Sequence, residues 1–275
     1  MMRRVQVKSN EFYNEYYGHR ISDLEKIYPI LRKSSRTLIW TAGDSTLDNK
    51  YWFTDHAQAV GVYKEVLNPP MSKCDVTYWL NFILEQRKTE GSTHVAAINT
   101  AVEATTLNAR SFKLKRQDIF LRDHISKDDI LIVSVGGNDV ALLPSPCTIA
   151  SMIGMLTLPM KCVEHGCTAG TIPVDDCCCG CGPSFCSCAG SCPPCLGYFA
   201  HMFGVRVQKY IEKLTEKTKP KKILVCMVYY LDEAPVPSWA GASLKAMGYD
   251  RDPARLQGFI KKVFEVATRY VIIYS

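Results

Sequence analysis

The stretch Trp40-Thr-Ala-Gly-Asp-Ser-Thr-Leu47 ends a short apolar run in a Gly-Asp-Ser turn. Further along the chain, a second apolar run ends in Val135-Gly-Gly-Asn-Asp139. Continuous apolar runs of this length are typical of parallel strands that are covered on both faces. Because ligands bind beyond the carboxyl ends of such strands, we expect the two turns to face one ligand-binding edge.

Short β-rich apolar runs alternate with segments of helical periodicity along the chain. The runs are Thr37–Thr41, His94–Ile98, Ile130–Val135, Ile223–Tyr229 and Tyr270–Tyr274. The helical segments are residues 11–33, 74–88, 104–121, 197–217 and 253–268, and the second of these places Val76, Trp79, Leu80, Ile83 and Leu84 on one face. This alternation predicts right-handed βαβ units and an α/β fold with an open parallel sheet.

Ser45 and Asn138 are the candidate functional side chains at the predicted edge. A serine hydroxyl becomes an effective nucleophile when a base removes its proton and hydrogen-bond donors stabilise the oxyanion. An asparagine amide aimed at the same place is such a donor. Either turn taken alone is also explained as local structure, since both are common turn sequences. Their coincidence at two strand ends favours a site.

These two motifs, in this order, resemble the SGNH (GDSL-type) hydrolases, a family of serine esterases and lipases. The resemblance covers about residues 36–145 and 220–275. It implies a three-layer α/β/α sandwich with a five-stranded, flavodoxin-like parallel sheet. It also implies that Ser45 is the nucleophile and an oxyanion N–H donor, and that the Asn138 side chain is a second donor. Gly43, Asp44 and Gly137 would support the two turns, with Asp44 acting as a turn-stabilising carboxylate rather than a catalytic acid.

A third block of the resemblance is weaker. It matches Asn99-Thr-Ala-Val-Glu-Ala-Thr-Thr106, where Ala101 and Ala104 stand at positions that are usually glycine. The backbone N–H of Ala104 would be the remaining oxyanion donor. Alanine retains that N–H, but it affects the φ angle that the turn can adopt and the room left for substrate.

The fourth block, an Asp-x-x-His motif after the fifth strand, does not occur in this sequence. The histidines are His19, His56, His94, His124, His165 and His201, and none stands at the expected position. His56 is explained more simply as a surface or helix-start residue, and His201 as a partly buried residue of a helix, than as a substitute base. His165, within the cysteine-rich segment, is either a metal ligand or a residue that leans over the site. We expect either a chain cut before its last helix, with the base beyond Ser275, or a degenerate hydrolase.

The implied function is hydrolysis of a carboxylic ester of a lipid or an acetylated carbohydrate through an acyl-enzyme on Ser45, with no cofactor for catalysis. Two alternatives remain open: a non-catalytic binding module with the same crevice, and an interaction protein that works through its cysteines. The stretch Asp48-Asn-Lys-Tyr-Trp52 either lines an acyl or alcohol site or places an aromatic pair in the core.

Composition limits the partners. The net charge of +6 in 275 residues is a mild excess, and solvated helix ends and loops explain it better than a nucleic-acid interface. The expected partner is a small-molecule ester. The N-terminus has no signal-peptide pattern and no apolar run reaches membrane-spanning length. We therefore expect an intracellular, cytoplasmic protein.

The cysteines gather in residues 146–196, which we interpret as an insertion into a hydrolase domain made of residues 1–145 and 197–275. A structural zinc site is the leading interpretation, with Cys179, Cys188, Cys192 and Cys195 as candidate ligands. A disulfide knot, S-acylation with membrane contact through residues 147–195, and an unliganded loop stay open as alternatives.

Overall fold

The computed structural model describes residues 6–35, 37–89, 94–144, 148–149, 151–153, 159, 161, 197–233, 245 and 248–271. The chain divides into two compact units. The first consists of Met1–Thr105, Phe112–Val135 and Glu212–Cys226. The second consists of Thr106–Ser111, Gly136–Ile211 and Met227–Ser275.

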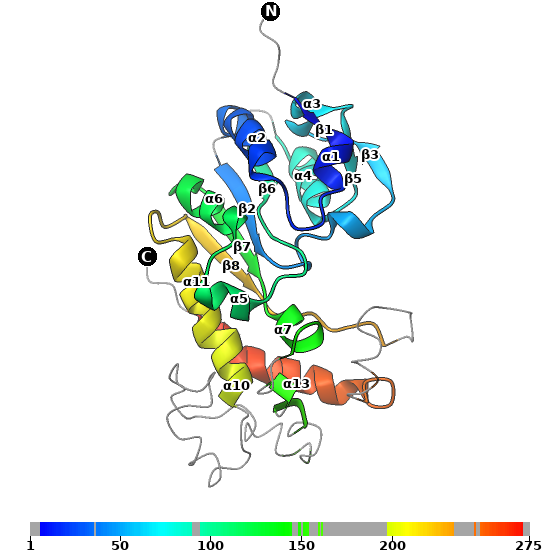
Figure 1. Ribbon diagram of the computed structural model, residues 1–275, viewed down its shortest axis with the longest axis vertical. Helices are drawn as coiled ribbons and strands as arrows, with labels where there is room; N and C mark the ends of the chain where they lie inside the picture. The colour runs from blue at the N-terminus through cyan, green and yellow to red at the C-terminus, as the bar shows by residue number, and fades with distance from the viewer. Residues whose placement is uncertain are drawn as a thin grey trace, which may run out of the picture. The chain divides into compact units, whose positions relative to one another are not determined.

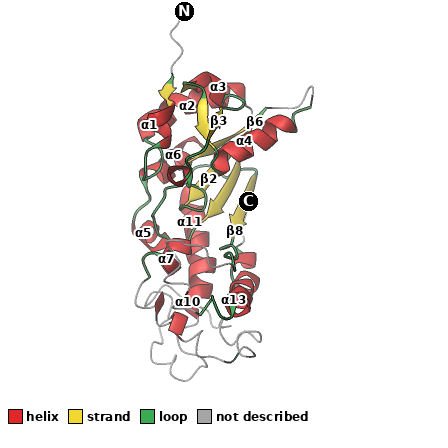
Figure 2. Cartoon of the chain, turned by 90° about the vertical axis from the view of Figure 1, so that its right-hand side faces the viewer, coloured by secondary structure: helices red, strands yellow, loops and turns green. Residues whose placement is uncertain are grey.

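The first unit is built on a four-stranded parallel sheet with the order β6-β2-β7-β8 (Figure 1 and Figure 2). Its strands are β2 (Thr37–Gly43), β6 (Val95–Asn99), β7 (Ile130–Ser134) and β8 (Lys222–Cys226). The prediction of an α/β fold with a parallel sheet is therefore confirmed. The first four predicted apolar runs supply these strands. After β2, the next strand in the chain, β6, pairs on one side of it, and the following strand, β7, pairs on the other side. The carboxyl ends of β2 and β7 therefore mark a topological switch point.

The fifth predicted run behaves differently where it is described. Tyr270 ends the 3₁₀ helix η5 (Thr268–Tyr270), and Val271 lies outside any strand. The remaining residues of that run, 272–274, lie outside the described residues. A five-stranded sheet stays a prediction.

The remaining elements among the described residues are as follows. The short strands are β1 (Val7–Lys8), which pairs with β4 (Leu67–Asn68), and β3 (His56–Gln58), which pairs with β5 (Met71–Lys73). The helices are α1 (Ser9–Tyr13), α2 (Ile21–Ser34), η1 (Lys50–Trp52), α3 (Tyr63–Val66), α4 (Val76–Gln86), α5 (Leu107–Phe112), α6 (Arg116–His124), α7 (Gly137–Ala141), α10 (Gly197–Ala200), the π-helix η4 (His201–Arg206), α11 (Val207–Leu214) and α13 (Pro253–Val266).

Helices α2 and α6 lie side by side against the sheet (Figure 1). The fully buried Trp40 ring of β2 packs between them, 5.7 Å from the Tyr28 ring and 6.2 Å from the Phe120 ring. At the amino end of β7, the buried Asp129 carboxylate accepts the indole N–H of Trp40 and two hydrogen bonds from Arg32. One carboxylate thus fixes β2 and α2 to the start of β7.

Helix α4 lies beside β6 in both views (Figure 1 and Figure 2). Its buried residues are Thr77, Tyr78 and Asn81. The Asn81 amide donates to the carbonyl of Ala97 and accepts its N–H, which turns this polar face toward β6. Trp79 remains 49% exposed. The predicted helix is confirmed, and on its apolar face Val76, Leu80 and Leu84 are half-buried.

Two predicted helices are each divided in the structure. Residues 11–33 form α1 and α2, separated by a loop in which Gly18 adopts φ +79°. Residues 104–121 form α5 and α6, because the Asp118 carboxylate accepts the Lys115 N–H and starts a new helix there. Segments 197–217 and 253–268 are helical as expected. Within the described part of the chain, no helix has both the length and the apolar character needed to cross a membrane.

Candidate functional site

Gly43 ends β2 at a point of very close approach to β7. It pairs with Ser134 and adopts φ +132°. A Cβ at this position would lie 1.7 Å from the carbonyl oxygen of Ser134. Only glycine fits both the space and the backbone angle, so the glycine of the Gly-Asp-Ser turn is required by the approach of the two strands.

Asp44 organises the turn itself. Its Oδ1 accepts the backbone N–H of Thr46 at 3.1 Å and the Thr46 hydroxyl at 2.9 Å. Its carbonyl accepts the N–H groups of Leu47 and Asp48. This pattern is an Asx turn, in which the carboxylate replaces a backbone acceptor. Asp44 is therefore engaged in local structure, and Ser45 follows it as a half-buried residue at the carboxyl end of β2.

The turn after β6 is hydrogen-bonded directly to the end of β2. The N–H of Thr100 donates to the Thr41 carbonyl at 3.0 Å, and the N–H of Val102 donates to the Gly43 carbonyl at 2.9 Å. The structure therefore brings the Gly-Asp-Ser turn and the predicted oxyanion turn to the same edge of the sheet. Ala101, the first position where glycine was expected, is fully buried.

Ala104, the second such position, adopts φ +54°. Among the described residues it is the one non-glycine residue with a positive φ. The left-handed region disfavours side chains with a Cβ, and non-glycine outliers of this kind concentrate at functional sites. The turn thus requires a left-handed backbone conformation at this position. Glycine adopts this conformation most readily, but the chain has Ala104 there.

Within the described part of the chain, two N–H groups at this edge have no acceptor. No hydrogen bond among the described residues uses the N–H of Ser45, the Ser45 hydroxyl or the N–H of Ala104. Backbone N–H groups of a folded chain are almost always paired with protein or water. Unused N–H groups on two adjoining turns are suited to bind an oxygen that carries negative charge.

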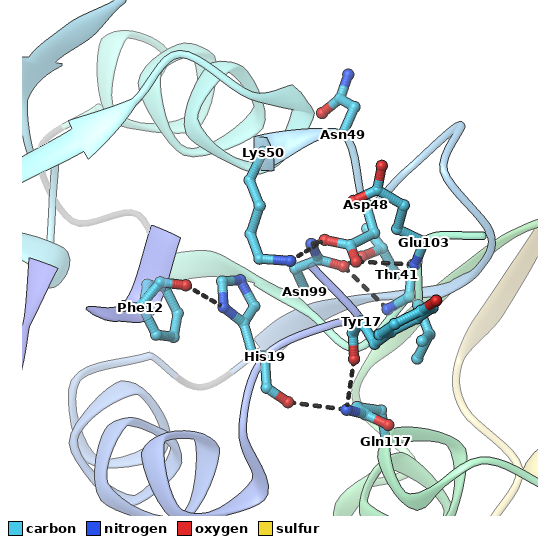
Figure 3. Close-up of polar contacts among 12 residues, drawn as sticks. Phe12, Tyr17, His19, Thr41, Asp48, Asn49, Lys50, Asn99, Glu103 and Gln117 are labelled. Carbon is cyan, nitrogen blue, oxygen red and sulfur yellow. Dashed lines mark hydrogen bonds and ion pairs between the residues drawn. The ribbon is translucent and has the colours of Figure 1, made fainter. Parts of the chain in front are cut away.

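The Asp48 carboxylate connects the two turns (Figure 3). Its Oδ2 accepts the backbone N–H of Glu103 at 2.9 Å, and its Oδ1 accepts the amide of Asn99 at 3.1 Å. The same Oδ1 accepts the ammonium of Lys50 at 2.6 Å, with both side chains 0% exposed. Asn99 in turn accepts the Thr41 hydroxyl and the N–H of Ala101. This network fixes the residues that lead into Ala104, including Glu103 directly before it.

Two further carboxylates are buried around the Lys50 ammonium. Neither oxygen of Glu103 has a hydrogen-bond partner, and the Trp52 indole lies close to it without reaching hydrogen-bond geometry. Asp75 caps α4 through Oδ1, whereas its Oδ2 has no partner. Burial, with the nearby Asp48 charge, raises the pKa of Asp75 and the pKa of Glu103 each to about 7. Lys50 opposes both rises.

The second unit contains Asn138 and Gly137, both in α7. Gly136 precedes the helix at φ +108°, and a Cβ there would lie 2.8 Å from the Phe203 ring. Asn138 is buried, and its carbonyl accepts the N–H groups of Leu142 and Leu143. The Asp139 carboxylate accepts the first N–H groups of α5, those of Leu107 and Asn108. The Gly-Gly-Asn-Asp turn therefore organises this unit locally.

The described histidines have structural environments of their own. His19 is buried, stacks on Phe12 at 3.7 Å and donates from Nδ1 to the Phe12 carbonyl. Burial lowers the pKa of His19 well below its ordinary value, and the Lys50 charge lowers it further. His56 is exposed on β3, and the buried His201 accepts a hydrogen bond from Arg206 at Nδ1. His94 and His124 precede β6 and β7, at the amino end of the sheet. His165 lies outside the described residues.

The predicted zinc ligands Cys179, Cys188, Cys192 and Cys195 also lie outside the described residues, so the zinc site stays a prediction. In the described part of the chain, no group of three or more histidine, cysteine or acidic side chains could hold a metal ion. The described cysteines, Cys74 and Cys226, are free thiols.

The stretch Asp48–Trp52 resolves an alternative that the sequence left open. Tyr51 is 45% exposed and Trp52 is 59% exposed, so they are not a core-facing aromatic pair. Lys50 occupies the interior instead. The sequence did not predict that Lys50 and Glu103 are buried at this edge of the sheet. The available signal was weak, because it consisted only of charged residues in two predicted turns that follow neighbouring strands.

No protein-family model matches the chain, and neither the curated proteins nor the solved structures gave a match to it.

Proposed function

We propose that this chain is a serine hydrolase that cleaves carboxylic esters through an acyl-enzyme on Ser45. The observation that supports this most directly is the pair of unused N–H groups, on Ser45 and Ala104, at adjoining turns on one sheet edge. A carbonyl oxygen held by both would be polarised beside the Ser45 hydroxyl, which also has no partner among the described residues.

The proposed reaction has two steps. The Ser45 Oγ attacks the ester carbonyl carbon and loses its proton to a base, and the bond to the alcohol oxygen breaks as the alcohol leaves with a proton. Water then attacks the acyl-serine and releases the acid. Asn138 supplies a third oxyanion donor in this proposal. The base lies outside the described residues.

The proposed fold is the five-stranded, flavodoxin-like form of the sheet. Numbered along the chain, the observed order β6-β2-β7-β8 is 2-1-3-4, which is the flavodoxin-like order for its first four strands. The outer edge of β8 has no strand partner among the described residues, and Leu224 on β8 is exposed. A fifth strand would pair at that edge.

The test combines covalent labelling with turnover. The purified full-length protein is treated with a fluorophosphonate probe, the labelled residue is identified by mass spectrometry, and hydrolysis of 4-nitrophenyl acetate is followed in parallel. We expect a single adduct at Ser45 and loss of both signals in Ser45→Ala. Asn138→Ala should lower the rate by about 100-fold or more.

The matched control is Ser126→Ala. Ser126 is half-buried like Ser45, but it precedes β7 at the opposite end of the sheet. Its replacement should change neither labelling nor turnover. A full-length wild-type protein that is folded, unlabelled at Ser45 and inactive on esters would contradict the proposal and favour the non-catalytic binding module.

A further inference from the structure

Four aromatic side chains form a cluster on two loops of the first unit. Tyr16 and Tyr17 lie between α1 and α2, and Tyr51 and Trp52 lie in η1. The Tyr16 ring is the centre of the cluster, with edge-to-face contacts to Tyr17 at 4.7 Å, Tyr51 at 5.0 Å and Trp52 at 6.4 Å. Tyr17 is 61% exposed, and the other two outer rings are about half exposed. Exposed apolar surface that is gathered in this way is commonly a binding surface.

The aromatic cluster borders the turn that carries Ala104. Gly18, next to Tyr17, is so close to that turn that a Cβ on it would lie 3.3 Å from the Ala101 carbonyl oxygen. Gln117 holds the loop there by donating to the carbonyls of Tyr17 and His19 (Figure 3). On the other loop, the Trp52 indole lies beside Glu103, the residue before Ala104. Both loops that carry the cluster therefore lie against the turn of Ala104, whose N–H is the proposed oxyanion donor.

The chemistry of the cluster selects among possible ligands. An acyl chain is best held by a groove of aliphatic side chains, whereas these residues are tyrosines and a tryptophan with polar edges. A cationic headgroup is disfavoured because the Lys73 ammonium already lies 6.0 Å over the Tyr51 ring. A neutral sugar ring has an apolar face of C–H groups that stacks on an aromatic ring, and hydroxyl groups around its edge that bind polar tips.

We propose that Tyr16, Tyr17, Tyr51 and Trp52 form a subsite that stacks a pyranose ring of the substrate, which makes the substrate class an acylated carbohydrate. This inference rests on the esterase function proposed above, since it names the alcohol half of the ester. The buried carboxylate of Glu103, which has no hydrogen-bond partner among the described residues, lies beside Trp52 at the inner edge of the subsite and would accept a hydroxyl of the stacked sugar.

The test measures binding without turnover. The Ser45→Ala protein is titrated with xylohexaose, cellohexaose and chitohexaose, followed by tryptophan fluorescence and calorimetry. We expect saturable binding of at least one of these oligosaccharides, weakened about 10-fold or more when Trp52→Ala is added. Trp79→Ala is the matched control, because Trp79 is 49% exposed on α4 and lies outside the cluster. It should leave the affinity unchanged, and thermal melts should show that every variant is folded.

The outcomes separate the subsite from the esterase. If none of the oligosaccharides binds, or if Trp79→Ala weakens binding as much as Trp52→Ala, the subsite is wrong. Binding of phosphatidylcholine vesicles that depends on Trp52, without sugar binding, would also overturn it. Ester hydrolysis that depends on Ser45 would survive each of these results. Sugar binding through Trp52 in a chain that hydrolyses no ester would instead support the subsite and reject the esterase.

Discussion

The Asp48 carboxylate accepts the backbone N–H of Glu103 at 2.9 Å, so one side chain joins the turn after β2 to the turn after β6. The same carboxylate pairs with the fully buried ammonium of Lys50. A buried ion pair of this kind is a poor source of net stability, but removal of one partner leaves an uncompensated charge. Its value here is geometric, since it fixes the residue that precedes Ala104.

Asp48→Asn should destabilise the protein by about 3–5 kcal/mol, because it leaves the Lys50 ammonium buried without a counter-charge. Lys50→Met should also destabilise it, since the Asp48 charge would then lack its cation. The double variant should be more stable than the sum of the two losses predicts, by about 1–3 kcal/mol. Urea unfolding of all four proteins measures this coupling. Strictly additive losses would show that the two side chains act independently.

The sequence predicted the four parallel strands because each is a short, continuous apolar run. A strand that is covered on both faces needs apolar side chains at successive positions, which produces this pattern. The sequence also placed the Gly-Asp-Ser turn and the turn of residues 99–106 at strand ends. It did not predict that Lys50 is interior. A lysine between Asn49 and Tyr51 looks like a surface residue, and only tertiary contacts supply the carboxylate that compensates its burial.

The face of α4 shows the same limit in another form. Periodicity correctly located the helix and its apolar residues, but it did not predict which residues are buried. Asn81 is buried because its amide completes the main-chain hydrogen bonds of Ala97. A buried polar side chain that is fully hydrogen-bonded cannot be distinguished from a solvated one by hydropathy alone.

Ala104→Gly should stabilise the protein by up to about 1 kcal/mol, because φ +54° strains a residue with a Cβ and glycine relieves that strain. The N–H of residue 104 is retained, so ester hydrolysis should persist. Ala101→Gly is the matched control: Ala101 is buried and has no positive φ, so its replacement should destabilise by about 0.5–1 kcal/mol. Thermal and urea unfolding report both values. The idea fails if the two variants change stability in the same direction.

Glu103→Gln and Asp75→Asn should each stabilise the protein selectively at high pH. Both carboxyls have a pKa of about 7 in the folded protein, above the unfolded values of about 4. The folded state therefore retains these protons longer, and wild-type stability falls as pH rises from about 4 to 7 and then levels off. Each variant should equal wild type near pH 4 and exceed it by about 1–3 kcal/mol at pH 8. Urea unfolding at both pH values tests this, and a pH-independent difference would contradict it.

Asp129 should show the opposite dependence on pH. Its carboxylate is buried, yet the hydrogen bonds from Arg32, Leu38 and the Trp40 indole lower its pKa despite that burial. A lowered pKa contributes stability that is present above the unfolded value of about 4 and is lost as pH falls through the folded value. Asp129→Asn should therefore cost about 3 kcal/mol at pH 7, and this difference from wild type should shrink as the solution is acidified below pH ~4. Asp123→Asn is the control, because Asp123 is exposed and pairs with the exposed Lys217. It should cost at most about 1 kcal/mol at pH 7, and an equal loss in the two variants would show that burial of Asp129 is not the cause.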